Sequence, residues 1–493
     1  MSADRGPRRG AAGRDTARRA GLPRRTAYDV LAAVEGRQAY ANLLLPRLLA
    51  ERGMAGRDAA LATELTYGTL RGLGTYDAIL AACSDRPLDK LDPPVLQVLR
   101  LGAHQLLATR VGAHAAVATS VDLAKAVAGQ RVSGYVNAVL RRVATRDLDA
   151  WLPLVTPDPA TDPDGCLAVR HSYPRWIVRA YRDALGAAAE AELEPALAAG
   201  NQRPRVTLAA FPAGPPRDEI MPETAEPTRW SPYGFTLQVG DPAALVATGA
   251  AAVQDEASQL AALALAQAPL DGPDTRWLDM CAGPGGKARL LYGLALQAGA
   301  YLVAADLHPH RAALVRDALA RASHPGSTGE EGDSPAAFRR TAAGNLPLRP
   351  GATVMAADGR RPPWRNAAFD RVLADVPCSG LGALRRRPEA RWRKSESDLP
   401  ALAELQRTLL RSALAACRPG GVVGYVTCSP VPAETSDVVT AVAGSDPAIE
   451  ILDAPAVLAA VPGVRSPSPR FAQLWPHRHG TDAIFVALLR RTR

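Results

Sequence analysis

Two cysteines stand in turns that directly follow strand-like segments of the sequence. Cys378 lies in ADVPCSGLG (374–382), three residues after Asp375, and Cys428 lies in YVTCSP (425–430). A serine follows the cysteine in both places. A thiol in such a turn can act as a nucleophile, whereas an isolated buried cysteine behaves as a small hydrophobic residue. The residues alone leave open which of the two thiols attacks.

A glycine-rich loop and three strand-ending aspartates come before these cysteines in the sequence. The loop LDMCAGPGGKA (278–288) lets the backbone approach a ligand closely, and the helix that follows it offers free N–H groups. It fits neither a Walker A loop nor a GxGxxG dinucleotide fingerprint. Asp306 closes YLVAAD, Asp358 closes TVMAAD and Asp375 closes RVLAD. An acid in the first of these places can accept both ribose hydroxyls. The set favours S-adenosylmethionine (AdoMet) in a doubly wound fold.

A methyl donor beside two thiols indicates methyl transfer to C5 of a pyrimidine. That carbon becomes nucleophilic only after a thiolate has added to C6. Methylation of an exocyclic amine needs no thiol, and its Asn/Asp-Pro-Pro-aromatic signature is absent from the sequence. A dithiol redox pair is a rival, but the sequence has no CxxC motif. For Cys83, Cys166 and Cys417 we expect a structural role.

A basic segment, LRRRPEARWRK (384–394), separates the two cysteines. Its cations can bind phosphates while Trp392 stacks on an unpaired base. The alternative is an ordinary solvated loop. Its position between two expected active-site strands favours a contact with nucleic acid.

The elements that must position these residues change type along the chain. Residues 26–147 repeat apolar positions at helical spacing, as in PPVLQVLRLGAHQLLAT, and show no strand alternation. From about residue 251, short apolar strands (RWLDM, YLVAAD, TVMAAD, RVLADV and GGVVGYVT) alternate with helices. Such alternation predicts a mostly parallel sheet with ligands at the carboxyl ends of its strands.

We therefore expect a multidomain chain. Its predicted parts are a disordered basic arm (1–22), an all-α domain (23–147), a linker with a small α/β connecting domain (148–240) and an α/β domain (241–493) with a disordered insertion (324–340). The net charge of +9 and the pI near 9.5 favour an anionic partner. Six scattered cysteines without zinc spacing, and no long apolar stretch, predict a reduced cytoplasmic protein with no metal and no membrane segment.

Four motifs resemble those of the Nol1/Nop2/Sun RNA cytosine-5 methyltransferases. In chain order they are DMCAGPGGK, AADLHPHR, ADVPCSGLG and YVTCSPVPAE. VQDEASQL and PHRHGTDAIFVALL resemble the opening and the close of that family's catalytic domain. In the helical half, ELTYGTLRG, VLRLGAHQLL and GYVNAVLRR resemble the NusB-type RNA-binding domain. This pairing is similar to the RsmB subgroup, which acts on 16S ribosomal RNA.

The resemblance implies a NusB-like all-α domain, a connecting domain and a Rossmann-like class I AdoMet-dependent methyltransferase domain. It places the ribose at Asp306, the adenine at Asp358, and the methionine end of AdoMet and the target cytosine near Asp375. It makes Cys428 the nucleophile and Cys378 the group that helps to release the methylated RNA. The loop residues that it assigns to AdoMet are Cys281, Ala282, Gly283, Pro284, Gly285, Gly286 and Lys287.

The predicted function is AdoMet-dependent methylation of cytosine C5 in 16S rRNA through a covalent adduct, by a monomer that needs no metal. Two alternatives remain. The same chemistry can act on tRNA, although the NusB-like half argues against it. The chain can also be a non-catalytic RNA-binding or ribosome assembly factor, which the retention of Asp375, Cys378 and Cys428 opposes. A nicotinamide oxidoreductase is disfavoured by the missing GxGxxG.

Overall fold

The chain folds into two compact units. The structure is a computed structural model that describes residues 9–238, 242–322 and 351–493, with side chains from Gly21 onward. Unit 1 comprises Met1–Arg179 and Leu384–Arg393, and unit 2 comprises Ala180–Ala383 and Lys394–Arg493. Within the described ranges, no helix combines the length and the apolar character needed to cross a bilayer.

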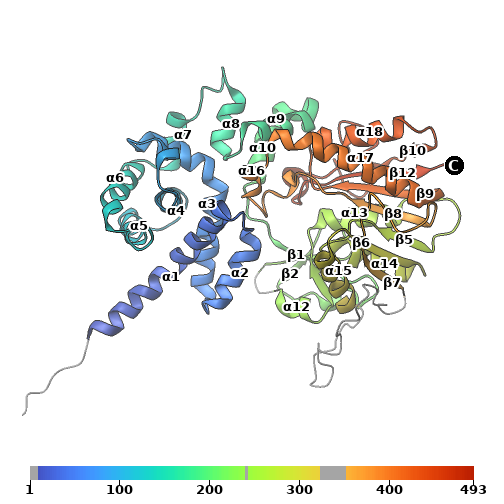
Figure 1. Cartoon of the computed structure of the whole chain (residues 1–493), viewed down its shortest axis with the longest axis horizontal. Helices are drawn as coiled ribbons and strands as arrows, with labels where there is room; N and C mark the ends of the chain where they lie inside the picture. Colours follow the sequence, from blue (N-terminus) through green and yellow to red (C-terminus); the bar gives the residue numbers. More distant parts are fainter. Residues whose placement is uncertain (1–8, 239–241, 323–350) are drawn as a thin grey trace, which may run out of the picture. The chain divides into compact units, whose positions relative to one another are not determined.

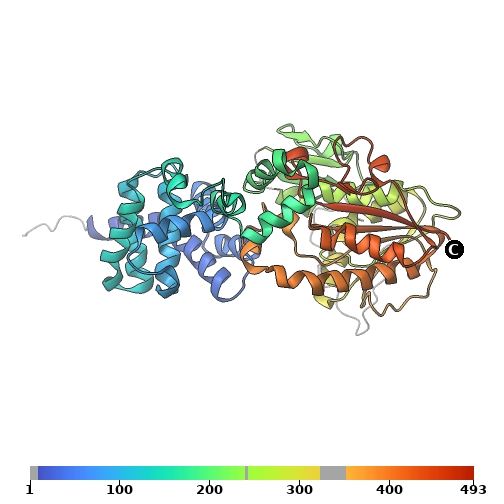
Figure 2. The same cartoon turned by 90° about the horizontal axis from the view of Figure 1, so that it is seen from above.

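All the secondary-structure elements described in unit 1 are helices, joined by turns and short loops (Figures 1 and 2). Pro93 and Pro94 open α4, where the missing N–H groups would have no helical partner in any case. Leu99 and Leu101 of α4 are fully buried and pack with Leu65 and Ile79 of α3. The elements are α1 (Arg9–Gly36), α2 (Ala41–Glu51), α3 (Gly56–Cys83), η1 (Leu88–Lys90), α4 (Pro93–Ala108), α5 (Ala113–Ala128), η2 (Gln130–Val132), α6 (Ser133–Val143), α7 (Leu148–Val155), α8 (Pro163–His171) and α16 (Ala390–Arg393).

Unit 2 contains two sheets. The smaller is antiparallel, with strand order β2-β3-β1-β4. The larger has the order β10-β12-β9-β8-β5-β6-β7, and β11 pairs with β12. The strands are β1 (Val206–Ala210), β2 (Ala225–Pro227), β3 (Gly234–Leu237), β4 (Ala251–Val253), β5 (Arg276–Asp279), β6 (Tyr301–Asp306), β7 (Ala352–Ala356), β8 (Phe369–Asp375), β9 (Cys417–Thr427), β10 (Ile449–Ile451), β11 (Ala472–Gln473) and β12 (Phe485–Arg491).

The five strands β7, β6, β5, β8 and β9 run parallel, β12 pairs with β9 antiparallel, and β10 pairs with β12 antiparallel. All five were expected from the apolar runs of the sequence, and the Rossmann-like α/β class is confirmed. The first six of the seven residues of β8 are buried, as expected for a strand that helices cover on both faces.

Two apolar cores lie on the two faces of the large sheet. One gathers α13, α14 and α15, and the other gathers α17 and α18 (Figure 1). The helices of this unit are η3 (Gly186–Ala188), α10 (Ala189–Ala199), α11 (Arg217–Ile220), α12 (Ala243–Ala247), α13 (Glu256–Gln267), α14 (Gly286–Gln297), α15 (Pro309–Ala322), η5 (Leu381–Ala383), η6 (Glu396–Asp398), α17 (Leu399–Ala416), η7 (Pro432–Glu434), α18 (Ser436–Gly444), α19 (Ala454–Val457) and α20 (Pro476–His479).

The domain limits differ from those expected from the sequence. The basic arm predicted for 1–22 is helical from Arg9, because α1 runs through to Gly36. The linker predicted to start at residue 148 instead forms α7 and α8, and the boundary between the units falls inside α9 (Arg175–Leu185). The strands in the predicted small α/β connecting domain (148–240) form an antiparallel sheet together with β4, and this sheet belongs to unit 2. The insertion predicted at 324–340 lies outside the described residues.

Candidate active site

The large sheet brings Cys378 and Cys428 together. β8 and β9 are parallel neighbours in which Asp375 pairs with Val426, so the turns that follow them leave the same edge of the sheet. The two sulfur atoms lie 3.3 Å apart, within hydrogen-bonding distance for thiols. The meeting of the two cysteines, expected from the strand order, is therefore present in the structure.

Glycine at position 382 keeps the two cysteine turns in contact. The backbone N–H of Gly382 donates to the carbonyl of Cys428 over 2.8 Å, and its own carbonyl accepts from the N–H of Ala483 over 2.9 Å. A Cβ at this position would overlap the Ala483 carbonyl oxygen and come within 2.9 Å of the Cys428 carbonyl oxygen. Because both neighbours are backbone atoms, only glycine fits without moving the turn of Cys428.

The two thiols differ in acidity because one hydrogen bond joins them. That bond is the main cause that lowers the pKa of Cys428, and Lys287 lowers it further, while burial, Asp375 and Asp482 oppose the change. The same hydrogen bond, together with burial, raises the pKa of Cys378 well above its ordinary value. Cys428 is therefore the more acidic thiol of the pair and loses its proton before Cys378 does, which suits Cys428 for nucleophilic attack.

Lys287 links the glycine-rich loop to the end of β8. Its ammonium group lies 2.9 Å from the carboxylate of Asp375, and both side chains are mostly buried. Burial alone would lower the pKa of Lys287, but Asp375 raises it above the ordinary value. The cation therefore stays charged beside the two cysteines.

The glycine-rich loop forms a narrow cradle between β5 and α14. Gly285 caps α14 with a φ of 115°, which favours glycine. The N–H of Gly283 donates to Asp306 over 3.0 Å, and Arg311 bonds the Gly283 carbonyl and lies 3.5 Å from Asp306. A Cβ on Gly283 would collide with the Asp306 carboxylate. Loop and acid thus lie against one another, as the binding of a nucleoside requires.

Asp279, at the end of β5, is a buried acid that we did not single out from the sequence. Among the described residues, no donor forms a hydrogen bond of good geometry with either of its carboxylate oxygens. Burial and the nearby Asp375 raise its pKa to about 8, against the opposing effects of Lys287 and the Cys281 amide. A buried carboxyl group without a hydrogen-bond partner would be stabilised by a ligand that supplies a hydrogen-bond donor or a positive charge. The sequence feature that could have identified Asp279 is its position at the end of a strand, which it shares with Asp306.

Asp358 and Cys281 lie near the glycine-rich loop, but their side chains are less available to a ligand than the sequence suggested. Asp358 follows β7 at the same edge of the sheet, where Ala357 donates to the Asp306 carbonyl. Its carboxylate is held by the Arg360 side chain over 2.8–3.1 Å, and the same arginine lowers its pKa. Cys281 is buried beside acids, and burial raises its pKa far above the ordinary value. It therefore contributes its backbone and its volume to the loop rather than a reactive thiol.

A second residue that we did not assign from the sequence, Glu434, connects the two cysteine turns. It is fully buried and accepts hydrogen bonds from Ser379, next to Cys378, and from Ser429, next to Cys428. It lies within the YVTCSPVPAE motif, but no local pattern marks a buried hydrogen-bond hub.

The basic segment between the cysteines is largely occupied by contacts within unit 1. Arg391 is fully buried, donates to the Ser172 carbonyl over 2.8 Å and lies 4.0 Å from the centre of the Tyr173 ring. The ring of Trp392 packs against Gly74, where a Cβ would come within 2.6 Å of it. The expectation that this whole segment faces nucleic acid is therefore wrong for Arg391, because burial removes its charge from solvent.

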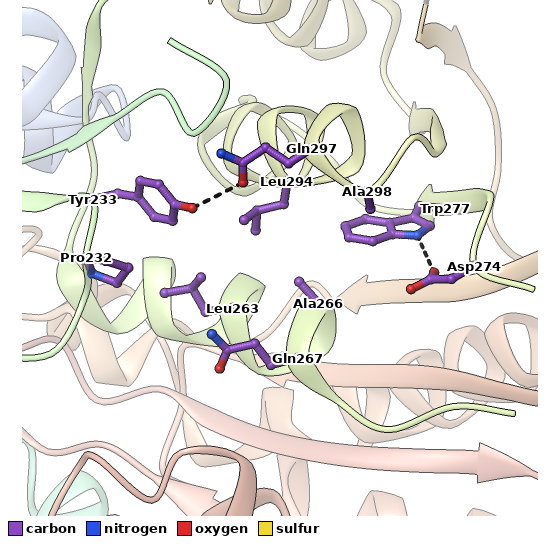
Figure 3. A pocket seen from close by; sticks show the side chains of 10 residues that line it. All are labelled: Pro232, Tyr233, Leu263, Ala266, Gln267, Asp274, Trp277, Leu294, Gln297 and Ala298. Carbon is purple, nitrogen blue, oxygen red and sulfur yellow. Dashed lines mark hydrogen bonds between the residues drawn. The ribbon is translucent and has the colours of Figure 1, made fainter. Parts of the chain in front are cut away.

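A cavity of about 320 Å³ lies elsewhere in unit 2 (Figure 3). It is bordered by α13, α14 and Trp277, the second residue of β5, whose indole donates to Asp274. Trp277 lies at the amino-terminal half of its strand, whereas the cysteines follow the carboxyl ends of β8 and β9. The cavity therefore belongs to the opposite edge of the sheet from the thiol pair.

Comparisons with known proteins find similarity over both halves of the chain. A family model described as "16S rRNA methyltransferase RsmB/F" matches residues 265–331 and 341–490, and a model of the NusB family matches residues 22–145. These are the regions whose motifs carried the two resemblances.

Individual relatives cover nearly the whole chain. "Putative methyltransferase Rv1407" of Mycobacterium tuberculosis is 47% identical over 95% of this chain and 96% of its own length. "Ribosomal RNA small subunit methyltransferase B" of Pseudomonas putida is 33% identical over 95% and 98% of the two chains. The crystal structure of PH0851 superposes with a TM-score of 0.72 over 96% and 99% of the chains. At 20% identity it shows a shared fold.

Proposed function

Because this chain belongs to the RsmB/F family of methyltransferases, we propose that it methylates C5 of a cytosine in 16S ribosomal RNA, with AdoMet as the methyl donor. The observation that carries the proposal is the thiol pair, 3.3 Å apart, in which the shared hydrogen bond lowers the pKa of Cys428 and raises that of Cys378. Attack on a pyrimidine and the later release of the product need one ionised and one protonated thiol. Methylation of an oxygen or an exocyclic amine would leave the pair without a purpose.

The proposed reaction starts at Cys428. Its thiolate forms a bond to C6 of the cytosine, and the electron pair displaced from the ring is stabilised as N3 takes up a proton. We assign to Asp375, which Lys287 holds over 2.9 Å, the transfer of that proton from Cys378 to N3. The base is then an enamine whose C5 is nucleophilic.

The residues around the glycine-rich loop fit AdoMet. Gly283 to Lys287 would take the methionine portion, Asp306 the ribose and Asp358 the adenine, while Asp279 offers an unsatisfied carboxyl group beside them. When bound, AdoMet supplies an electrophilic methyl group on a sulfonium centre, which matches the nucleophilic C5 of the adduct. For Asp358 to take the adenine, Arg360 must release it or share it.

Release of the product is assigned to Cys378. Its raised pKa depends first on the hydrogen bond to Cys428. Once the Cys428 sulfur is bonded to C6, that cause is gone, and Cys378 can exist as the thiolate left by proton transfer to N3. It then takes the C5 proton, the C5–C6 double bond forms again, and Cys428 leaves as a thiolate. N3 returns its proton to solvent, so the cycle closes with both cysteines in their starting states.

The test combines the full chain with AdoMet labelled in its methyl group and with purified 16S rRNA or tRNA. We expect labelled 5-methylcytosine in 16S rRNA only, no product with Cys428→Ala, and a covalent protein–RNA adduct that accumulates with Cys378→Ala. Normal methylation by Cys428→Ala would overturn the mechanism. Labelling of tRNA alone would transfer the same chemistry to the other RNA, and binding without methylation by the wild type would support an assembly factor instead.

A further inference from the structure

A buried carboxylate holds the two cysteine turns together from behind the thiols. Glu434 ends η7 and has no solvent exposure. One of its oxygens accepts from the backbone N–H of Ser379 over 2.7 Å and from the side chain of Gln406 over 3.1 Å. The other accepts from the hydroxyl groups of Ser379 and Ser429. Four donors therefore converge on one side chain.

These donors come from three separate parts of unit 2. Ser379 directly follows Cys378 after β8, and Ser429 directly follows Cys428 after β9. Gln406 lies on α17 and also donates to the carbonyl of Pro377 over 2.9 Å, so it ties the first cysteine turn to the helix as well. The hydroxyl oxygens of Ser379 and Ser429 lie 3.2 Å apart, and the sulfur atoms of the neighbouring cysteines lie 3.3 Å apart. The serine pair thus has nearly the same spacing as the thiol pair.

The backbone of Glu434 is itself fixed. Its carbonyl accepts from the hydroxyl group of Tyr425 over 2.7 Å, and its N–H donates to the Val431 carbonyl over 2.9 Å. Tyr425 is fully buried in β9. A side chain anchored at both ends in this way acts as a rigid clamp rather than a surface carboxylate that happens to lie nearby.

We propose that Glu434 is a positioning residue that sets the contact between the two thiols and so keeps Cys428 in its reactive form. The inference rests on the proposed function for its meaning in catalysis. The claim that Glu434 fixes the distance between the two sulfur atoms does not depend on the proposed function. Without Glu434, four donors lose their acceptor and the two turns are free to separate.

The charged and titratable groups around Cys428 determine how its pKa would change if the two cysteine turns separated. Cys378 lowers the pKa of Cys428 most, and Lys287 adds to the effect, while Asp375 and Asp482 oppose it. No hydrogen bond joins Glu434 to Cys428 among the described residues, although the negative charge of Glu434 helps to raise the pKa of Cys378. Its removal should therefore act by weakening the bond from Cys378, and the other three groups should remain in place.

The experiment measures how fast iodoacetamide alkylates Cys428 as a function of pH, with the modified peptide identified by mass spectrometry. It uses the full chain without RNA or AdoMet. For Glu434→Ala we expect the pH at which the alkylation rate of Cys428 reaches half its maximum to shift upward by about one unit, because the thiolate loses stabilisation. Glu434→Gln should keep the wild-type profile, since its amide oxygen can accept from Ser379 N–H and Gln406 while its NH₂ group donates to the serine hydroxyl groups.

Gln259→Ala is the matched control. Gln259 is an equally buried hub in the same unit, bonded to Ser231 and to the carbonyl groups of Leu208 and Gln254. We expect it to lower stability without moving the alkylation profile. If Glu434→Ala does not fold, Ser429→Ala removes one of the four donors and should give a smaller shift in the same direction.

Three results would overturn the proposal: an unchanged profile in folded Glu434→Ala, an equal shift in Gln259→Ala, or a full shift in Glu434→Gln. Because alkylation requires neither RNA nor a methyl donor, failure of the proposed function would appear separately. In that case the wild type would methylate no RNA while the alkylation profiles still differed as expected.

Discussion

Replacing Asp279 by asparagine should stabilise the ligand-free protein, and increasingly so as the pH rises. The carboxyl group is fully buried and has a pKa of about 8, against 3.8 for an unperturbed aspartate. Each unit of this difference corresponds to about 1.4 kcal/mol, so the ionised form is disfavoured in the fold by up to about 6 kcal/mol. Asparagine keeps the shape and carries no charge to bury.

The sign of the pH dependence follows from proton uptake. Between the two pKa values the folded state holds a proton on Asp279 that the unfolded state has lost, so the stability of the wild type falls as the pH rises from about 4 to about 8. Asp279→Asn removes this contribution. Chemical unfolding of both proteins at a series of pH values should give a difference that grows by several kcal/mol over this range.

Asp370→Asn supplies a control of opposite sign. Asp370 is equally buried, and although burial opposes ionisation, Arg418 and the amides of Thr275 and Arg276 lower its pKa. Its replacement should destabilise the protein at neutral pH, because Arg418 loses its buried partner. A difference between wild type and Asp279→Asn that stays constant with pH would refute the reasoning, since it would mean that Asp279 is not a buried, protonated acid.

Other predictions follow from the packing around the cysteines and in unit 1. Peroxide should oxidise the Cys428 thiolate to a sulfenic acid, from which Cys378 displaces water; mass spectrometry should find that single disulfide, and dithiothreitol should restore reactivity. Gly382→Ala should slow alkylation of Cys428 at least severalfold, because the added Cβ moves its turn; an unchanged rate would contradict the close approach. Arg391→Ala should lower the free energy of unfolding by about 3 kcal/mol, measured by chemical denaturation of the full chain, because a buried, stacked side chain is lost.

The sequence predicts the site to the extent that the site depends on the order of the strands. Cys378 follows β8 and Cys428 follows β9, and since neighbouring parallel strands end at one edge, the meeting of the two thiols could be expected before any coordinates. The same argument located Asp306 and the glycine-rich loop. It should also have included Asp279, which ends β5 in the same manner.

What the sequence does not predict is how side chains share partners across elements. The four donors around Glu434 come from turns and a helix up to 55 residues away, and no periodicity links them. The prediction for the basic segment 384–394 failed at Arg391 for the same reason. Its composition is typical of a surface that binds phosphates, but Arg391 is buried against Ser172 and Tyr173, which are more than 200 residues away.

If the proposed reaction holds, the arrangement of the thiols explains why two cysteines serve better than one. A single low-pKa thiolate would add to the base readily, but nothing at the same place would then accept the C5 proton. In this pair one proton is shared, and its position depends on whether Cys428 carries a charge, since the hydrogen bond to Cys428 is the first cause of the raised pKa of Cys378. In the proposed reaction, bond formation at Cys428 would therefore prepare Cys378 for the opposite step. The 3.3 Å separation of the sulfur atoms makes this exchange possible, and for that reason we expect residues that fix the separation to affect the chemistry without contacting the RNA.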